Sequence, residues 1–354
     1  MNPASRSDRP SHVLVTGGAG YIGSHMCAVL AQAGHRVVVV DNFSNATRDV
    51  IDRVRRAADG KVDVVEADVR DEAALARVFG EFAIDAVFHF AGLKSVAESV
   101  RAPLDYFSHN VGGSLALLRQ MQAAGIFTLV FSSSATVYGG ASASPIPEEA
   151  PMLVVNPYGR SKAMVEAMLA DLAASDPAWR IACLRYFNPV GAHPSGLLGE
   201  TPAGEPANLM PHMVQVAAGQ RAALPVYGND YPTRDGTGIR DYIHVMDLVE
   251  GHLAALDYLR GAPGCETFNL GTGRGVSVLE LVRAFEASTG QPVPLQAMDR
   301  RPGDVAECFA DPARAQRLLK WRACRSLEDM CRSSWQWAQT IIPAQQATPP
   351  GSSS

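Results

Sequence analysis

The hydrophobic positions of the chain fall into short runs that are separated by glycine-rich turns and by longer helical stretches. The first run, His12–Thr16, leads directly into glycines, and a second run, Val37–Asp41, is almost entirely valine. Strands that are apolar on both faces are typical of a parallel sheet covered by helices on each side. Between these two strands the pattern predicts a helix over Gly23–Gly34, which ends at Gly34.

The same alternation continues through the first half of the chain. Further strands are predicted at Val62–Glu66, Ala86–Phe90, Thr128–Ser132 and Ile181–Arg185, with helical stretches between them. Strands that alternate with helices in this way predict an α/β fold, a doubly wound parallel (Rossmann-like) sheet with right-handed crossovers.

The pattern changes after about Phe187. Residues 189–208 are rich in glycine and proline, and the regular alternation weakens. We expect residues 12–187 to form the first domain, with a later return around 240–258, and residues 188–340 to form mainly a smaller, mixed substrate-binding domain. The termini, 1–11 and 344–354, are polar or rich in Pro, Gln and Ser, and are predicted to be disordered.

Composition mainly excludes classes of function: nucleic-acid binding, metal binding and membrane insertion. The 354 residues carry a formal net charge of -5, and the basic residues are scattered, so no nucleic-acid surface is expected. The six cysteines show no CxxC pair and no metal-ligand spacing, which favours reduced thiols and no metal site. No run is long enough to span a membrane and no apolar signal core is present, so we expect a cytoplasmic protein.

The glycines after the first strand have the context of a dinucleotide-binding turn. Gly17, Gly20 and Gly23 lie between a strand and a helix, whose N-terminal N–H groups favour a pyrophosphate. An ordinary tight turn is the alternative for such a motif alone. Asp41, however, ends the second strand near the expected offset of a ribose-binding carboxylate. A carboxylate there accepts hydrogen bonds from ribose hydroxyls and repels a 2′-phosphate, so the sequence favours NAD over NADP.

Asp68 follows the third predicted strand. A carboxylate at this position either reaches the adenine of the dinucleotide or caps the next helix at the solvent surface. The spacing alone leaves both interpretations open.

Tyr158 and Lys162 lie four residues apart on a predicted helix that continues to about Ala174, so they share one face. A free phenol has a pKa of about 10, and a nearby ammonium and a nicotinium ring both favour the phenolate. Tyr158 is therefore a candidate general base. A tyrosine and a lysine at this spacing also occur by chance on many helices. The run Ser132–Thr136 supports the catalytic interpretation, because it ends a predicted strand where doubly wound sheets bind ligands.

Together these motifs resemble the extended short-chain dehydrogenase/reductase family, and within it the UDP-glucose 4-epimerases. The resemblance runs from about Val13 to Trp337. It is carried by Gly17–His25 (GGAGYIGSH), Phe90–Lys94 (FAGLK), Ser132–Gly139 (SSSATVYG), Tyr158–Lys162 (YGRSK), Arg185–Pro194 (RYFNPVGAHP), Asn208–Pro211 (NLMP), Gly238–Val245 (GIRDYIHV) and Arg301–Asp304 (RPGD).

The resemblance implies reversible C4 epimerisation of UDP-glucose and UDP-galactose through a 4-keto intermediate, with tightly bound NAD, in galactose metabolism. It implies that Tyr158 is the base, that Lys162 is its electrostatic and ribose partner, and that Ser134 with Thr136 binds the reacting sugar hydroxyl. The positions matched to NAD contacts are Gly17, Gly20, Tyr21, Ile22, Gly23, Asp41, Asn42, Ser44, Asn45, Asp68, Val69, Phe90, Ala91, Gly92, Lys94, Asn110, Ser132, Tyr158, Lys162 and Phe187. The positions matched to UDP-hexose contacts are Lys94, Ser134, Thr136, Tyr158, Asn188, Asn208, Leu209, Tyr227, Arg240, Tyr242, Arg301, Asp304 and Cys308.

Two positions depart from or refine this pattern. Many epimerases carry two adjacent asparagines where this chain has His109 and Asn110, and which of the two makes the cofactor contact stays open. We assign no proton transfer to His109, because a lone histidine is more often a packing residue. Cys308 matches a position beside the sugar C2 substituent where some relatives carry tyrosine. The smaller cysteine predicts activity on UDP-N-acetylglucosamine and UDP-N-acetylgalactosamine as well; the alternative is a buried small hydrophobic residue.

The competing functions share the fold. A 4,6-dehydratase needs an acid/base carboxylate pair after the serine or threonine, whereas this chain has Ala135 and Thr136 there. A scaffold protein that has lost catalysis is the other alternative, since fold does not prove function. The helices near Leu104–Ala123 and Ser161–Ala174 carry broad apolar faces, which relatives pair into a four-helix bundle. A homodimer is therefore expected, the alternative being that these faces pack only on their own sheet.

Overall fold

The structure is a computed structural model that describes residues 12–346, apart from residues 59, 141–142, 202–203, 205, 207 and 302 and the side chains of 342–346. Helix α12, Leu327–Gln346, includes the first residues of the C-terminal segment that was predicted to be disordered. The rest of that segment and residues 1–11 lie outside the described residues.

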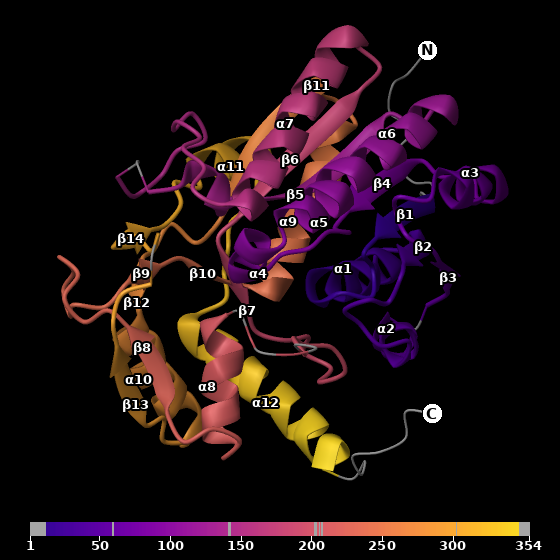
Figure 1. Ribbon diagram of the computed structural model, residues 1–354. Helices are drawn as coiled ribbons and strands as arrows, with labels where there is room; N and C mark the ends of the chain where they lie inside the picture. Colours follow the sequence, from indigo (N-terminus) through magenta and orange to yellow (C-terminus); the bar gives the residue numbers. More distant parts are fainter. Residues whose placement is uncertain are drawn as a thin grey trace.

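A seven-stranded parallel sheet forms the centre of the molecule (Figure 1), with the strand order β11-β6-β5-β4-β1-β2-β3. This architecture confirms the doubly wound sheet. The strands are β1 His12–Thr16, β2 Arg36–Asp41, β3 Val62–Glu66, β4 Ala86–His89, β5 Thr128–Ser134, β6 Arg180–Tyr186 and β11 Gly264–Leu270. The order reverses between β1 and β4, and ligands of such sheets bind at the carboxyl ends of the strands beside this switch point.

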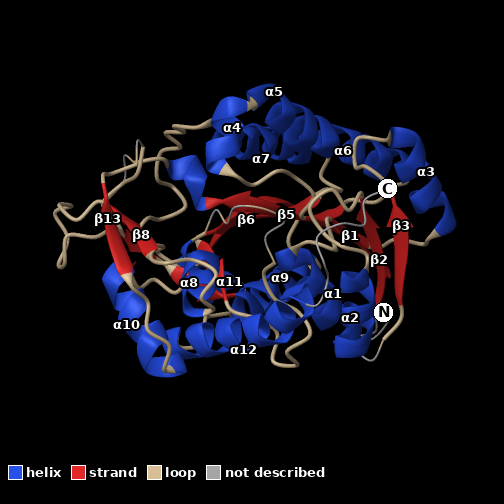
Figure 2. Cartoon of the chain, turned by 60° about the horizontal axis from the view of Figure 1, so that its bottom comes forward, coloured by secondary structure: helices blue, strands red, loops and turns tan. Residues whose placement is uncertain are grey.

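Helices cover both faces of the sheet (Figure 2). One face carries α1 Tyr21–Gln32, α2 Asp49–Ala58 and α9 Val245–Leu259; the other carries α3 Glu72–Glu81, α6 Gly113–Ala123 and α7 Pro157–Ser175. The valine run in β2 has a direct physical reason. Val37 and Val39 pack into the core under α1, whereas Val38 and Val40 pack into the core on the opposite face, so all four valines of the strand are buried.

The short helices α4 Val96–Arg101 and α5 Pro103–Tyr106 follow β4, and a π-helical segment, Phe107–Gly112, joins α5 to α6. These two helices lie beside α7 on the outside of the molecule (Figure 2).

A second region, built from small sheets and helices, lies beyond the carboxyl ends of the central strands (Figure 1). Its strands are β7 Asn188–Val190, β8 Leu224–Tyr227, β9 Ile239–Arg240, β10 Tyr242–His244, β12 Val276–Ser277, β13 Leu295–Met298 and β14 Glu307–Cys308, and its helices are α8 Leu209–Ala217, α10 Val278–Thr289 and α12. Strand β7 pairs with β10, β8 with β13, and β9 with both β12 and β14. Met213, Leu281, Phe285 and Cys331 are among the residues that form the separate core of this region.

The chain returns to the central sheet through more than the segment that was expected. Helix α9 covers the sheet, and β11 then adds a seventh strand beside β6. Helix α11, Ala313–Leu318, packs against β11. We therefore propose that the return to the first domain extends from α9 through β11, to Leu270; the division into domains as a whole stays a prediction.

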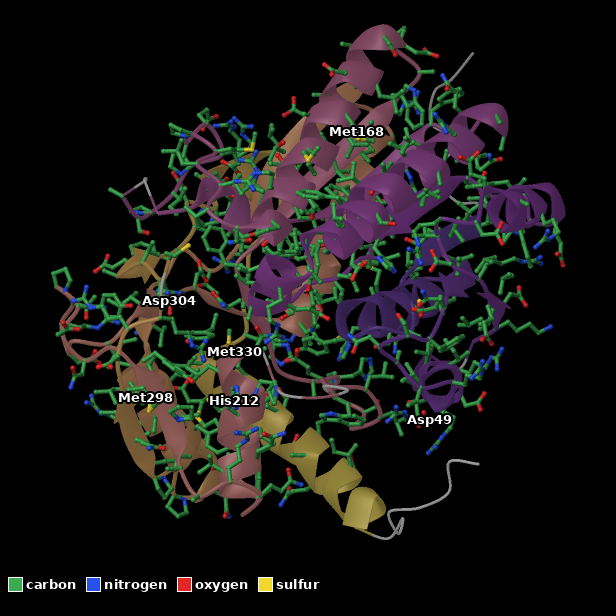
Figure 3. The ribbon with its side chains drawn as sticks, in the orientation of Figure 1. Asp49, Met168, His212, Met298, Asp304 and Met330 are labelled. Atoms are coloured by element: carbon green, nitrogen blue, oxygen red, sulfur yellow. The ribbon has the colours of Figure 1, made fainter. Side chains whose placement is uncertain are left out.

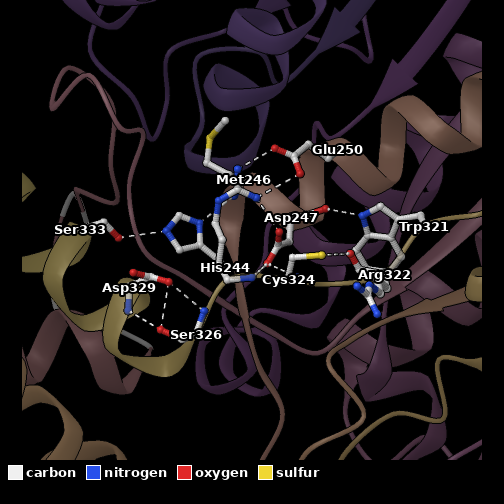
Figure 4. A network of polar contacts seen from close by, with 11 residues as sticks. His244, Met246, Asp247, Glu250, Trp321, Arg322, Cys324, Ser326, Asp329 and Ser333 are labelled. Atoms are coloured by element: carbon white, nitrogen blue, oxygen red, sulfur yellow. Dashed lines mark hydrogen bonds and ion pairs between the residues drawn. The ribbon is translucent and has the colours of Figure 1, made fainter.

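A polar network centred on the buried Asp247 joins α9 to the segment before α12 (Figure 4). The carboxylate of Asp247, in the first turn of α9, accepts hydrogen bonds from the backbone N–H groups of Cys324 (3.1 Å) and Arg325 (2.9 Å) and pairs with the Arg325 guanidinium. The indole N–H of Trp321 donates to the Asp247 carbonyl at 3.0 Å. These contacts hold the central sheet and the second region together.

Candidate active site

The turn between β1 and α1 brings backbone close to backbone at the carboxyl end of β1. A Cβ atom on Gly17, whose φ is +71°, would lie 2.6 Å from the backbone nitrogen of Ala91, and one on Gly23 would lie 2.2 Å from the Gly17 carbonyl oxygen. Both positions therefore require glycine. Gly20 occupies the N-cap of α1 and supplies no capping side chain, which suits a helix N-terminus that binds an anion. This cradle fits the pyrophosphate of a dinucleotide.

Asp41 lies at the end of β2, beside this turn. Its carboxylate accepts hydrogen bonds from the backbone N–H groups of Ala19 (3.0 Å) and Phe43 (2.8 Å). Burial raises the pKa of Asp41, and these two hydrogen bonds oppose that shift. The contact with Ala19 ties the carboxylate to the glycine turn, which is where the ribose of NAD is expected. Asn42, Ser44 and Asn45 follow in the exposed loop after β2.

The Asp68 side chain pairs with Arg70 and does not cap a helix. The Arg70 guanidinium donates to both carboxylate oxygens, at 2.8 and 2.9 Å, and its charge and hydrogen bonds lower the pKa of Asp68. The N-cap of α3 is Asp71, whose carboxylate accepts from the Ala74 N–H at 2.9 Å. The capping alternative for Asp68 is therefore wrong, and its adenine contact stays a prediction, as does that of the buried Val69.

Asn110 connects the loop after β4 to α7. Its side-chain oxygen accepts from the Leu93 N–H (2.8 Å), and its amide donates to the Leu93 carbonyl (3.0 Å) and to the Ser161 hydroxyl (2.9 Å). His109 bonds instead to the carbonyl of Asp105, one turn back in its own helix. Of the two candidates, Asn110 therefore holds the loop that contains the predicted cofactor contacts Phe90, Ala91, Gly92 and Lys94.

Helix α7 begins with Asn156, whose side-chain oxygen accepts from the Gly159 N–H at 2.8 Å, and with Pro157 at its first position. This start places Tyr158 and Lys162 over the end of β5. The Lys162 ammonium donates to the Ser132 carbonyl at 2.7 Å and lies 4.9 Å from the centroid of the Phe131 ring. Burial lowers the pKa of Lys162 to about 8.

Tyr158 and Ser134 meet at the carboxyl end of β5. The Ser134 hydroxyl lowers the pKa of Tyr158, but burial has the larger effect and raises it. Burial of the phenol thus opposes the phenolate form that was expected from neighbouring charges alone. The positive charge near Tyr158 has to lower its pKa by more than burial raises it. Thr136 lies next to Ser134, and its hydroxyl donates to the Ser134 hydroxyl at 2.9 Å.

A buried ion pair beneath these groups was not predicted. Glu166, one turn beyond Lys162 on α7, accepts from the Ser133 hydroxyl and pairs with the Arg185 guanidinium at 2.6 Å; both charged side chains are 6% exposed. Arg185 also donates to the Tyr138 hydroxyl at 2.9 Å, which in turn donates to Asn269 at 2.6 Å. Two features of the sequence could have indicated this pair: Arg185 lies inside an apolar strand, and Glu166 follows Tyr158 and Lys162 at a spacing of four residues.

Glu200, also missed, joins two of the predicted substrate contacts. One of its carboxylate oxygens lies 3.1 Å from the Lys94 ammonium and accepts from the Asn208 amide at 3.1 Å. Asn208 precedes α8, which begins at Leu209. The structure thus brings Lys94 of the first domain and Asn208 of the second region together across the carboxyl edge of the sheet.

The small strands β8, β9 and β14 bring together the remaining charged candidates. Arg240 donates to the carbonyls of Ile239 (2.8 Å) and Val305 (2.9 Å), and its guanidinium lies 3.8 Å from Asp304, which Figure 3 shows beside this sheet. The Arg301 guanidinium lies 3.7 Å from the centroid of the Tyr227 ring. We call Arg240, Arg301 and Asp304 the arginine-bearing wall. Two guanidinium groups suit the oxygens of a diphosphate.

Three further candidates pack inward. Phe187 is 8% exposed, and Cys308 packs against the same small core, which also includes Ala135. In the parallel pairing of β14 with β9, the backbone of Cys308 lies opposite that of Arg240. Tyr242 is buried in the core of the second region, and burial raises its pKa to about 12. Asn188 lies on β7 and is partly exposed.

A dinucleotide cradle, a tyrosine–lysine–serine group at the end of β5 and an arginine-bearing wall together define an enzyme of the nucleotide-sugar type. The model of the NAD dependent epimerase/dehydratase family matches residues 13–271. The chain belongs to this family, which confirms the resemblance inferred from the motifs.

Individual relatives are similar over nearly the whole chain. UDP-glucose 4-epimerase of Bacillus subtilis is 54% identical over 93% of this chain and 97% of its own length. The structure of the Stenotrophomonas maltophila epimerase with NAD and formylated UDP-arabinopyranose has a TM-score of 0.93 at 53% identity, covering 94% and 99% of the two chains. The UDP-Glc/GlcNAc 4-epimerase of Campylobacter jejuni has a TM-score of 0.81 at 35% identity, covering 93% and 99%.

Two further structural facts bear on the sequence analysis. All six cysteines, which lie within the described residues, are free thiols. Among the helices that the structure describes, none is long and apolar enough to cross a membrane.

Proposed function

We propose that this protein interconverts UDP-glucose and UDP-galactose by inverting the configuration at C4, with NAD bound through both half-reactions. The observation that carries the proposal is that α7 brings Tyr158 and Lys162 to the carboxyl end of β5, where Lys162 donates to the Ser132 carbonyl and Ser134 lies beside Tyr158. Gly17, Gly20 and Asp41 would hold NAD, which accepts the C4 hydride and returns it.

The chain's own residues divide the remaining work. Tyr158 removes the proton of the C4 hydroxyl and later gives it back, while Ser134 with Thr136 orients that hydroxyl. Lys162 supplies positive charge near the phenolate. Arg240 and Arg301 hold the diphosphate, so the 4-keto sugar can turn about its link to UDP and present its opposite face. Binding energy at UDP thereby keeps the intermediate in the site.

One assay separates this proposal from its rivals. Purified holoprotein is incubated with UDP-galactose and no added reductant, and the nucleotide sugars are resolved by chromatography. Formation of UDP-glucose is expected. A 4-keto-6-deoxy product would indicate a dehydratase, and unchanged substrate would indicate a protein that has lost catalysis.

The cofactor is tested separately by denaturing the purified protein and identifying the released dinucleotide by mass spectrometry. We expect NAD, because a carboxylate at Asp41, at the end of β2, would repel a 2′-phosphate. Release of mainly NADP would contradict the assignment of Asp41.

We also propose that the enzyme accepts the N-acetylated UDP-hexoses. Cys308 packs against the core that includes Phe187 and Ala135, beside the catalytic strand end. A cysteine there leaves more space than a tyrosine would. The relative from Campylobacter jejuni, named for both UDP-Glc and UDP-GlcNAc, belongs to the same structural group.

Finally, we propose a homodimer formed through α4–α7. Parts of these helices pack on the sheet, as Leu117, Val165 and Leu169 do. Others leave large apolar side chains exposed on the outer surface, namely Val96, Val100, Leu104, Leu115 and Met164, with Leu104 79% exposed. An apolar face of this kind suits a helical bundle with a second copy. Light scattering of the wild type and of Leu104→Glu tests this, and a monomeric wild type would contradict it.

A further inference from the structure

Asp241 is a buried carboxylate between two predicted substrate contacts, Arg240 and Tyr242. Its side chain is fully buried where β9 gives way to β10. The carboxylate accepts four hydrogen bonds: from the Thr272 N–H (2.8 Å), the Thr272 hydroxyl (2.6 Å), the Gly273 N–H (3.0 Å) and the Ala310 N–H (3.1 Å). All four donors are neutral groups.

The backbone of Asp241 makes two more connections. Its N–H donates to the Cys308 carbonyl at 3.2 Å, and its carbonyl accepts from the Asn188 N–H at 2.9 Å. One residue therefore joins β7, β9, β14 and the turn after β11. Asn188, Arg240 and Cys308, which these segments carry, are all candidate contacts of the UDP-sugar.

The fit around this carboxylate is tight. A Cβ atom on Gly271 would lie 2.6 Å from one Asp241 oxygen and 2.7 Å from the Ala310 side chain. A longer side chain than aspartate therefore has no room. A neutral amide does not substitute either, because asparagine has only one acceptor oxygen and its NH2 group would face N–H donors.

Burying an ionised carboxylate without a cation is costly unless hydrogen bonds satisfy it. Burial raises the pKa of Asp241, and its hydrogen bonds from Thr272, Ala310 and Gly273 oppose that shift. The residue is thus a carboxylate whose four donors belong to three residues on two segments, 272–273 and 310, which are far apart in the sequence.

We propose that Asp241 is a positioning residue for the UDP-sugar, which fixes the strand bearing Arg240 against the strand bearing Cys308 by holding Thr272, Gly273 and Ala310. The inference rests on the proposed function. It assigns Asp241 to substrate affinity rather than to proton transfer, because its contacts reach the wall and not Tyr158.

The test compares Asp241→Asn with the wild-type holoenzyme. The Kd for UDP is measured by calorimetry, KM and kcat are measured with UDP-galactose, and the dinucleotide content is measured after denaturation. We expect Kd and KM to rise about tenfold or more, as for lost hydrogen bonds to a charged group, with kcat within about threefold and unchanged NAD content. Thr272→Ser keeps both donors and should behave as wild type, whereas Thr272→Val loses one donor and should fall between.

Asp247→Asn is the control, because Asp247 is as deeply buried and accepts two backbone hydrogen bonds, but holds the segment before α12 and pairs with Arg325 rather than with neutral donors alone. A general loss of folding would raise the Kd for UDP equally in both variants, and that outcome would overturn the inference. Wild-type affinity in Asp241→Asn would overturn it as well. A wild type that binds UDP but does not epimerise UDP-galactose would instead refute the proposed function, and the UDP-binding comparison would still decide the role of Asp241.

Discussion

The protein holds the proposed proton-transfer groups and the arginines proposed to bind the substrate in different ways. Tyr158 and Lys162 come from α7, a 19-residue helix. Lys162 donates to the Ser132 carbonyl in β5, and the buried pair of Glu166 and Arg185 begins one turn further along α7. Arg240 comes from a two-residue strand, and its side chain is 22% exposed. The first arrangement fixes geometry to within a hydrogen bond, which proton transfer requires. The second leaves charged groups free to exchange water for a diphosphate.

Changes in the first region should therefore lower kcat or stability, and changes in the second should raise KM. The largest effect is expected from Tyr158→Phe. Removing the phenolic hydroxyl removes the base, so kcat should fall about 10²–10⁴-fold, while NAD content and thermal unfolding stay as in the wild type. Stopped assays with UDP-galactose measure this, and near-normal turnover would refute the assignment of Tyr158.

The next effect concerns stability. Glu166→Gln leaves the Arg185 charge buried without its partner, which should lower the free energy of unfolding by about 3–5 kcal/mol. Asp304→Asn is the matched change on the wall. Because Asp304 lies 3.8 Å from Arg240 and is 39% exposed, we expect a loss of at most about 1 kcal/mol.

Urea denaturation of the NAD-loaded proteins measures both values. Replacing both members of the buried pair, as Glu166→Leu with Arg185→Met, should recover part of the loss, because no unpaired charge then remains. Equal losses in Glu166→Gln and Asp304→Asn would contradict the contrast between the two regions.

The same contrast explains what could be predicted from the sequence. The glycine turn and α7 rest on local patterns, and both lie within a few residues of their predicted positions. The contacts of Asp241 could not be predicted, because its donors, Thr272, Gly273 and Ala310, come from 31 to 69 residues further along the chain. The place of β11 was missed for the same reason, since pairing with β6 is decided by tertiary packing rather than by local propensity.

A third prediction concerns Arg301→Lys. The planar guanidinium stacks on Tyr227 and presents paired donors, which an ammonium does not replace. KM for UDP-galactose should rise about 10–100-fold, as expected for charged hydrogen bonds of about 1.5–3 kcal/mol, with kcat nearly unchanged. Arg300→Lys is the control, because the Arg300 guanidinium pairs with Asp230 instead. A similar KM in both variants would show that Arg301 does not hold the diphosphate.

The smallest effect on UDP-galactose turnover, and the sharpest on substrate choice, is expected from Cys308→Tyr. Cys308 lies on the wall, paired with Arg240, and packs against the core under the catalytic strand end. A tyrosine would fill space that an N-acetyl group at C2 needs but a hydroxyl does not, because a clash rejects one substrate without weakening contacts to the other. The wild type should therefore interconvert UDP-N-acetylglucosamine and UDP-N-acetylgalactosamine. Cys308→Tyr should lose this activity while its kcat/KM for UDP-galactose stays within about threefold. Cys308→Ser, similar in size to the wild type, should keep both activities. If the wild type turns over neither N-acetylated sugar, another wall of the pocket sets the limit and the role given to Cys308 is wrong.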